Sequence, residues 1–300
     1  MLNIKTGINS AITKVYEEQP WEGYYMVRGA EITNLLRLAK LNKFGRVLEV
    51  GCGNGFSSYL MSFISKEVIA TDLYAQEAKT HSVGLESAKR LFSKLGNTGM
   101  PLLSCSVEHI PFKDDVFDMA FCSHTLHYLK GKALALNELR RVINKDGFII
   151  LIVPNFIERI YAFFQFYLYF VVKFFRFAKE RIARKNSICC NSSKRTSLSL
   201  SKLKENYRYF PLPGPHGAYK NSIVEMMSHL PSSWNQEFNK AGLYLQRSFT
   251  TTFTPYPLLL TMSLRLAHAV SLVSEPLTRV MGDKPFVKYF GYSYCVILKK

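Results

Sequence analysis

The chain lacks the cysteine patterns that disulfide-linked or zinc-binding domains need. Its 300 residues include six cysteines, whose spacing gives neither a zinc site nor a disulfide framework. We therefore expect a reducing compartment and no bound metal. The first residues also lack the apolar core of a signal peptide. These absences together predict a cytoplasmic protein. The cysteines at 52, 105 and 122 are expected to be small, buried hydrophobic residues.

Acidic residues are scarce relative to basic ones. The chain has 39 Lys and Arg against 22 Asp and Glu, a formal net charge of +17. A nucleic acid or an anionic membrane would attract such a chain equally. The total charge therefore does not identify the partner, and the position of the charge decides more.

The charge is concentrated next to the most apolar stretch of the chain. Between Lys173 and Arg195 there are eight Lys or Arg residues and one acid, Glu180. The stretch before them, 160–175, is interrupted only by Gln165 and Lys173. It falls short of the roughly twenty apolar residues that a bilayer span requires.

Polar positions in this stretch follow spacings of three, four or seven residues, which is typical of one stripe along a helix. A basic segment beside such a helix is typical of a membrane-surface element. We therefore expect residues 156–178 to make peripheral membrane contact. Burial of this helix inside the protein or a dimer is one alternative, and a true transmembrane span is another.

The most informative motif is a loop with glycine at every second position. A hydrophobic strand that includes Glu49 runs into Gly51, Cys52, Gly53 and Gly55, and a helix-like segment follows. Because glycine has no Cβ, such a loop can turn sharply and bring its backbone against a ligand. The spacing differs from the pyrophosphate-binding pattern, and the acid disfavours a phosphate. The motif therefore predicts a ligand that carries an amino group.

A second acid, Asp72, ends the next predicted strand about twenty residues later, where a carboxylate can accept from both ribose hydroxyls. Further motifs are 106–112, with Pro111-Phe112, and Phe117-Asp118. Together these residues resemble the class I S-adenosylmethionine-dependent methyltransferases with a methyltransferase type 11-like domain, a group that includes ubiquinone and menaquinone methyltransferases. The resemblance covers roughly residues 30–155.

The resemblance implies that S-adenosylmethionine is the cofactor. Glu49 and the glycine loop would face its methionine part, and Asp72 would hold its ribose. The implied cofactor-binding residues are Glu49, Gly51, Cys52, Gly53, Gly55, Asp72, Leu73, Ser106, Val107 and Ser123. The chain departs from its relatives at Ser106, where they usually carry Asp. Serine can accept from the adenine amine only without charge.

Three histidines are candidate bases for an acceptor hydroxyl. His124 and His127 follow the fourth predicted strand, and His216 lies in a loop bounded by glycine and proline. Histidine is the side chain best poised to accept a proton at neutral pH. We expect the base to be His127 or His216 in preference to His124. His124 lies nearest the end of the strand, where turning the chain into the next helix is a sufficient role for it. A helix-capping or packing role is the alternative for His124 and His127, and a structural or solvated role is the alternative for His216.

The order of elements predicts an α/β fold, a Rossmann-like, seven-stranded doubly wound sheet. Strands are expected at 46–50, 67–72, 102–106, 116–122, 147–153, 243–253 and 292–298. Helices are expected at 132–144 and 232–241, the second with Ser232 or Ser233 as N-cap and Gly242 as its stop. Part of 185–222 is expected to be a mobile loop. The expected segments are an N-terminal helical lid (1–45), the cofactor core (46–154), a hydrophobic and basic insertion (155–231), a core helix and sixth strand (232–253), an apolar insertion (254–290) and the last strand (291–300).

Both hydrophobic helical insertions are expected on the substrate side, because ligands bind outside the carboxyl ends of the strands. This arrangement favours a methyltransferase acting at a membrane surface on a small-molecule, lipid-linked or glycan acceptor, with O-methylation preferred. An RNA methyltransferase is supported only by charge. It is disfavoured because the fourth strand runs into Cys122-Ser-His-Thr instead of an Asn-Pro-Pro-aromatic turn. A non-catalytic interaction protein with a vestigial cofactor site is the third hypothesis.

Overall fold

The computed structural model describes residues 22–40, 43–73, 84–186, 212–215, 217, 219–253 and 264–300. A seven-stranded sheet runs through it in the order β3-β2-β1-β4-β5-β7-β6. The strands are β1 (Phe44–Val50), β2 (Ser65–Asp72), β3 (Leu102–Ser104), β4 (Phe117–Ser123), β5 (Ile143–Pro154), β6 (Tyr244–Phe249) and β7 (Ser293–Lys299). The predicted fold class is confirmed.

The first five strands are parallel, and β7 inserts antiparallel between β5 and β6. Val50 at the end of β1 is level with Thr71 on β2 and Cys122 on β4. Because the chain goes from β1 outward to β2 and β3 and then returns to β4, the strand order reverses between β1 and β4. Such a reversal is where open α/β sheets bind ligands.

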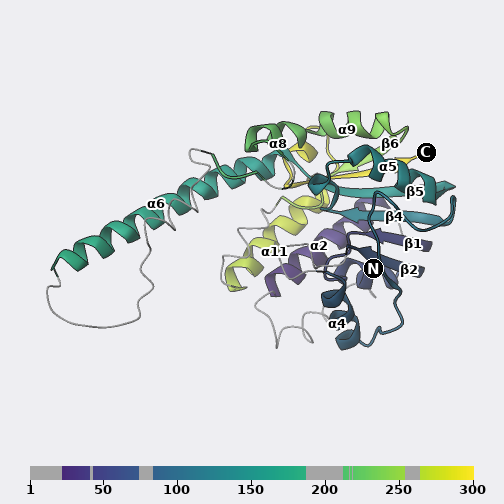
Figure 1. Ribbon diagram of the computed structural model, residues 1–300, viewed down its shortest axis with the longest axis horizontal. Helices are drawn as coiled ribbons and strands as arrows, with labels where there is room; N and C mark the ends of the chain where they lie inside the picture. Colours follow the sequence, from purple (N-terminus) through teal and green to yellow (C-terminus); the bar gives the residue numbers. More distant parts are fainter. Residues whose placement is uncertain are drawn as a thin grey trace.

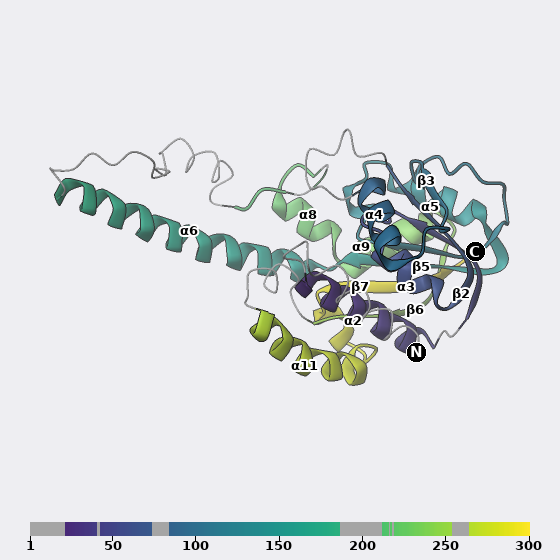
Figure 2. The ribbon, with the colours of Figure 1, turned by 90° about the horizontal axis from the view of Figure 1, so that it is seen from below.

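Helices cover both faces of the sheet (Figure 1). One face carries α2 (Glu22–Ala39), α4 (Leu85–Leu95) and α11 (Leu264–Met281), and the other carries α5 (Lys132–Val142), α8 (Ser222–Ser228) and α9 (Pro231–Lys240). Helix α3 (Phe56–Ser62), labelled in Figure 2, shares its core with α2 and α4. Alternate residues of a strand serve opposite faces, as the pleat requires. Phe121 of β4 joins the core under α2 and α3, whereas its neighbours Ala120 and Cys122 join the core under α5 and α9.

Helix α6 (Phe156–Asn186) is different from the others. It begins two residues after β5, is 31 residues long and projects away from the sheet (Figure 2). The described residues also include two short 3₁₀ turns, η2 (Leu126–Tyr128) after β4 and η3 (Val287–Phe290) before β7. The carboxyl end of β5 is therefore joined directly to a long arm.

Two predicted helix boundaries were wrong. Helix α5 ends at Val142, and the next residues already belong to β5. Helix α9 has Leu230 as N-cap without a side-chain hydrogen bond, and Pro231 opens the first turn. Proline takes this position because its fixed φ suits a helix start and its missing N–H would be unpaired there. Ser233 instead donates to the carbonyl of Met227 at 2.8 Å.

The stop of α9 at Gly242 is confirmed, because this residue has a φ of 66° and donates to the carbonyl of Asn239. The loop expected within 185–222 lies largely outside the described residues. So do most of the lid before α2 and the start of the second insertion. The division into six segments therefore stays a prediction.

Candidate functional site

The glycine loop turns tightly at the point where the strand order reverses. Gly51, Gly53 and Gly55 have φ values of 72°, 55° and 78°, a region that favours glycine. A Cβ on Gly51 would lie 2.0 Å from Oγ1 of Thr125, which follows β4. A Cβ on Gly55 would lie 2.7 Å from the ring of Phe92 on α4. The first glycine therefore lets β1 approach β4, and the last lets α3 approach α4.

Four backbone N–H groups of this loop are already used within the protein. Gly51 and Cys52 both donate to the carbonyl of Thr71, at 2.8 and 2.9 Å. Gly53 donates to Asp72 Oδ2 at 2.6 Å, and Gly55 donates to the carbonyl of Cys52 at 2.9 Å. A phosphate would need such N–H groups as donors. The geometry therefore agrees with the expectation that the loop does not bind a phosphate.

Asp72 lies where β2 ends and faces the glycine loop. Its Oδ2 accepts from Gly53, and its Oδ1 accepts from the N–H of Leu73 at 2.7 Å. Its partial burial raises the carboxyl pKa, and these two hydrogen bonds oppose that rise. Each carboxylate oxygen accepts more than one hydrogen bond. Asp72 can therefore receive a diol while it stays fixed to the loop.

Glu49 is almost fully buried beneath this loop, with 1% of its surface exposed. Burial raises its pKa to about 7, although hydrogen bonds from Ser58 and Ser57 and the charge of Arg28 lower it. The hydroxyl of Ser58 on α3 donates to the carboxylate. A positively charged ligand group nearby would favour the ionised form. This carboxylate is suited to an ammonium or sulfonium group.

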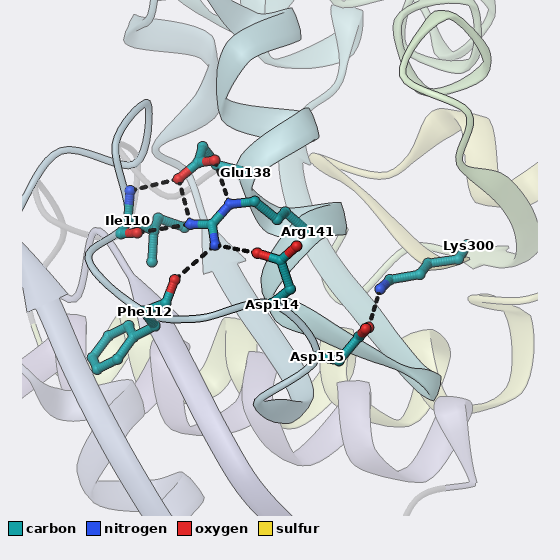
Figure 3. A network of polar contacts seen from close by, with 7 residues as sticks. All are labelled: Ile110, Phe112, Asp114, Asp115, Glu138, Arg141 and Lys300. Atoms are coloured by element: carbon teal, nitrogen blue, oxygen red, sulfur yellow. Dashed lines mark hydrogen bonds and ion pairs between the residues drawn. The ribbon is translucent and has the colours of Figure 1, made fainter.

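The segment after β3 is held by a network that sequence reasoning did not assign (Figure 3). Arg141 on α5 donates to the carbonyls of Ile110 and Phe112, at 2.8 and 2.7 Å. Glu138 accepts from the N–H of Ile110 at 2.8 Å and from Nε of Arg141 at 2.7 Å. Arg141 also pairs with Asp114 at 2.8 Å. The available signal was the placement of Glu138 and Arg141 three residues apart, which puts both on one face of a helix.

The clamped segment contains the two residues expected at the adenine edge. Val107 is buried, whereas the Ser106 hydroxyl is half-buried and accepts from the N–H of Glu108 at 3.2 Å. Leu73, expected against the adenine ring, has 59% of its surface exposed. The backbone joins the two pieces, because Cys105 donates to the carbonyl of Asp72 at 3.1 Å. These positions lie on the side of the loop that Asp72 occupies.

The end of β4 provides the other wall of the site. Ser123 is buried, and its hydroxyl lies 3.4 Å from Nη1 of Arg28 on α2. The next residue, His124, has a φ of 53° and donates its N–H to the carbonyl of Ile152. Thr125 then reaches back to the glycine loop, with Oγ1 3.5 Å from the carbonyl of Gly51. His124 therefore stands between the loop and the end of β5.

The other two candidate histidines differ from His124. His127 lies in η2, is 6% exposed and has its ring centroid 3.9 Å from that of Tyr128 and 6.0 Å from that of His229. His216 lies outside the described residues. Sequence reasoning also missed Glu31 on α2, a buried carboxylate 3.6 Å from Nε2 of His124. No local pattern could reveal it, because these two residues are far apart in the chain.

These residues fit the cofactor that the sequence motifs imply. Four N–H groups of the loop already donate within the protein, which disfavours a phosphate-led mode of binding. A fixed carboxylate at the end of β2 suits a ribose, and a buried carboxylate at β1 suits a cationic group. The fold and site together define the class I S-adenosylmethionine-dependent methyltransferase architecture.

Comparisons with known proteins agree with that class. A model of the methyltransferase domain family matches residues 48–151. Residues 48–151 of this chain therefore carry the sequence pattern of a methyltransferase domain. The match begins inside β1 and ends inside β5, so it covers the cofactor half of the site and neither α2 nor α6.

Relatives resemble this chain over the same part. An uncharacterized methyltransferase, YcgJ from Bacillus subtilis, is 25% identical over 124 residues, which is 41% of this chain and 46% of the relative. The malonyl-[acyl-carrier protein] O-methyltransferase of Legionella pneumophila is 29% identical over 106 residues, or 34% of each chain. The chain thus spans less than half the length of these two relatives. An S-adenosylmethionine-dependent methyltransferase from Mesorhizobium loti aligns over 91% of this chain and 100% of its own, with 15% identity and a TM-score of 0.48.

Proposed function

We propose that this protein transfers a methyl group from S-adenosylmethionine to an oxygen of a lipid-linked, glycan or other amphipathic acceptor at a membrane surface. When bound, the cofactor supplies a methyl group on a cationic sulfur, and its displacement requires mainly positioning and exclusion of water. Glu49, the glycine loop and Asp72 would hold the cofactor. The name of the relative from Legionella pneumophila supports an oxygen acceptor.

The observation that carries the membrane part of the proposal is the exposed surface of α6. Large apolar side chains protrude around the helix, with Phe164 at 68% and Phe175 at 66% exposed. The other exposed ones are Ile160, Tyr161, Tyr167, Leu168, Tyr169, Val171, Val172 and Phe174. Water is a poor solvent for so much contiguous apolar surface, and such patches mark interaction sites. The described residues of the same chain do not cover it.

Charge favours a membrane as the occupant of this surface. The second half of α6 and the residues after it carry the eight basic residues and the single acid between positions 173 and 195. Aromatic residues followed by a basic segment match the acyl boundary and the anionic headgroups of a cytoplasmic membrane face. A helix of 31 residues is roughly 45 Å long, from its rise of about 1.5 Å per residue. It can reach well beyond the domain.

The alternatives to a membrane-surface helix predict different surroundings for α6. No helix within the described residues combines the length and apolarity needed to cross a bilayer. Burial of α6 against the described residues of this chain does not agree with its exposure. Packing against a second copy would hide the phenylalanines without any lipid. RNA binding would use the basic residues and leave the aromatic side chains in water.

A vesicle experiment separates these alternatives. The full chain should co-sediment with vesicles of phosphatidylglycerol and phosphatidylcholine. The variant Phe164→Glu with Phe175→Glu should bind at least a hundredfold more weakly, because burying two such side chains contributes about 3–6 kcal/mol. Phe286→Glu with Phe290→Glu is the matched control, since these residues are 76% and 64% exposed but lie outside α6.

The control variant should bind vesicles like the wild type. If the wild-type protein does not bind vesicles but binds RNA, and both variants bind RNA with the same affinity, the RNA alternative would replace this proposal. Transfer itself is tested with methyl-labelled S-adenosylmethionine and a butanol extract of membranes as acceptor. Label should appear in the extract with the wild type. With Asp72→Ala, the labelling rate at a limiting cofactor concentration should fall about 10–100-fold, in step with the weaker cofactor binding.

A further inference from the structure

Helix α2 brings a buried carboxylate to the end of β4. Glu31 is 3% exposed, and its Oε2 pairs with Nη1 of Arg28 one helical turn before it. The same Arg28 nitrogen lies 3.4 Å from the hydroxyl of Ser123. The carboxylate therefore lies beside the residues that close β4, although α2 precedes the family-matched segment.

A second set of contacts fixes Glu31 from the other side. Thr251, which follows β6, donates its hydroxyl to Glu31 Oε1 at 3.0 Å. That hydroxyl also lies 2.7 Å from the hydroxyl of Ser293 at the start of β7. Asn34, on α2, donates to the carbonyl of Thr251 at 3.2 Å. Arg28 and Thr251 thus contact the two carboxylate oxygens of Glu31, and Asn34 and Ser293 hold Thr251 in turn.

The same oxygen of Glu31 faces His124. Nε2 of His124 lies 3.6 Å from Oε1 of Glu31, and the histidine side chain is 21% exposed. Burial raises the pKa of Glu31, but the charge of Arg28 and the contact with His124 outweigh it and lower the pKa to about 2. The carboxylate is therefore ionised throughout the neutral range, and one nitrogen of His124 faces it.

The main-chain conformation of His124 is a second sign of a functional role. Its φ of 53° is rare for a residue with a side chain, and such positions cluster at active sites. The N–H bond to Ile152 on β5 and the contact of Thr125 with Gly51 hold this turn in place. The turn that contains His124 therefore fixes the position of its backbone and also contacts the glycine loop.

We propose that Glu31 is the positioning residue of a carboxylate–histidine pair in which His124 removes the proton from the acceptor hydroxyl. This inference rests on the proposed function. The acceptor O–H bond breaks as the O–CH₃ bond forms, and the proton moves to the His124 nitrogen that faces away from Glu31. The S–CH₃ bond breaks with its electron pair retained on sulfur, which leaves a neutral thioether. Glu31 balances the charge on the imidazolium until solvent takes the proton.

This assignment reverses the order expected from the sequence, in which His127 came before His124. His127 is enclosed by Tyr128 and His229 and is 6% exposed, whereas His124 is partly open and faces a carboxylate. A base must reach the proton that it removes. A carboxylate that orients the base is the arrangement that makes histidine effective in hydrolytic triads.

The test compares charge removal with charge retention at position 31. Transfer of label from methyl-labelled S-adenosylmethionine to a butanol extract of membranes is measured as a function of extract concentration. His124→Gln should lower the maximal rate about 10²–10⁴-fold, the range for a general base. Glu31→Gln should lower it at least tenfold with little change in the half-saturating extract concentration. Glu31→Asp, which keeps the charge, should recover a large part of the rate.

Two controls separate positioning from folding and from cofactor binding. Calorimetry with S-adenosylhomocysteine should give the same affinity in wild type, His124→Gln and Glu31→Gln. His229→Gln, a change at another buried histidine, should retain the wild-type rate per folded molecule. A wild-type rate in Glu31→Gln, or equal losses in Glu31→Gln and Glu31→Asp, would overturn this inference alone. Wild-type protein that binds no S-adenosylmethionine would overturn the proposed function as well.

Discussion

The cofactor core and helix α6 use apolar residues in opposite ways. In the core, side chains such as Leu48 on β1 and Phe121 on β4 have no exposed surface, and residues 48–151 match a widespread domain family. In α6, Phe164 and Phe175 are more than 60% exposed, and the family match ends before the helix begins. The two regions differ because the apolar residues of the core pack against one another within the family-matched segment, whereas those of α6 lie outside that segment and face away from the core.

The largest expected effect is at the junction of the two regions. Arg159, in the first turn of α6, is buried and has Nε 3.3 Å from Oε2 of the buried Glu225 on α8. Its Nη2 donates to the carbonyl of Gly214 at 3.1 Å. Arg159→Met should lower the free energy of unfolding by about 3–5 kcal/mol, because Glu225 would keep a buried charge without this partner. Urea denaturation measures the change.

The matched control for that prediction is an exposed pair. Arg46 and Glu67 form an ion pair on the sheet at 2.6 Å, with side chains 46% and 42% exposed. Arg46→Met should cost less than about 1 kcal/mol, because solvent screens such pairs. Equal losses in the two variants would show that the root of α6 is no more firmly fixed than the protein surface.

The next effect concerns Glu49 and depends on pH. Its pKa is raised from 4.5 to about 7, so the folded state disfavours the charged form. The unfolded chain releases this proton first as pH rises. The associated stability is therefore present at low pH and is lost as pH rises towards 7. Between pH 5 and pH 8 we expect this residue to reduce the free energy of unfolding by about 2–3 kcal/mol.

Glu49→Gln should remove that part of the pH dependence, which urea denaturation at both pH values will show. Saturating S-adenosylmethionine should reduce it in the wild type, since a cationic ligand stabilises the carboxylate. If wild type and Glu49→Gln have parallel pH profiles, Glu49 is not the buried acid of this site.

The smallest effect is at the adenine edge of the core. Ser106→Asp would introduce the acid that the family resemblance implies at this position, and a carboxylate can still accept from the N–H of Glu108, 3.2 Å from the present hydroxyl. A hydrogen bond to a charged group contributes about 1 kcal/mol more than a neutral one. S-adenosylhomocysteine should therefore bind about fivefold tighter by calorimetry. Weaker binding would place the adenine elsewhere.

The sequence was sufficient for the parts of the molecule that depend on local pattern. Alternating and continuous apolar segments located the strands, and glycine spacing located the loop at the end of β1. Contacts between side chains that are distant in the sequence could not be predicted from it. Glu31 and Thr251 form a hydrogen bond although 220 positions separate them, and no periodicity links them. The same limit hid Arg159 and Glu225, whose pairing depends on where α6 and α8 pack.

Boundaries that depend on competition between elements were also less predictable. The apolar pattern of α5 continues into β5, so only the hydrogen bonding of β5 with β4 shows where the helix ends. At α9, serine at two adjacent positions suggested a cap, but the proline before them determined the start. Local sequence preference predicted the correct type of element, but the predicted boundaries were displaced by one or two residues.

The central claim is that the core binds S-adenosylmethionine through its own carboxylates, independently of the α6 surface. Titration calorimetry with S-adenosylhomocysteine tests it most directly, on wild type, Asp72→Ala and Phe164→Glu with Phe175→Glu. The account predicts one binding site in the wild type and the same affinity in the α6 variant. Binding to Asp72→Ala should be about 10–100-fold weaker, from the loss of charge-assisted bonds to the ribose. Absence of binding heat in the folded wild type would contradict the account.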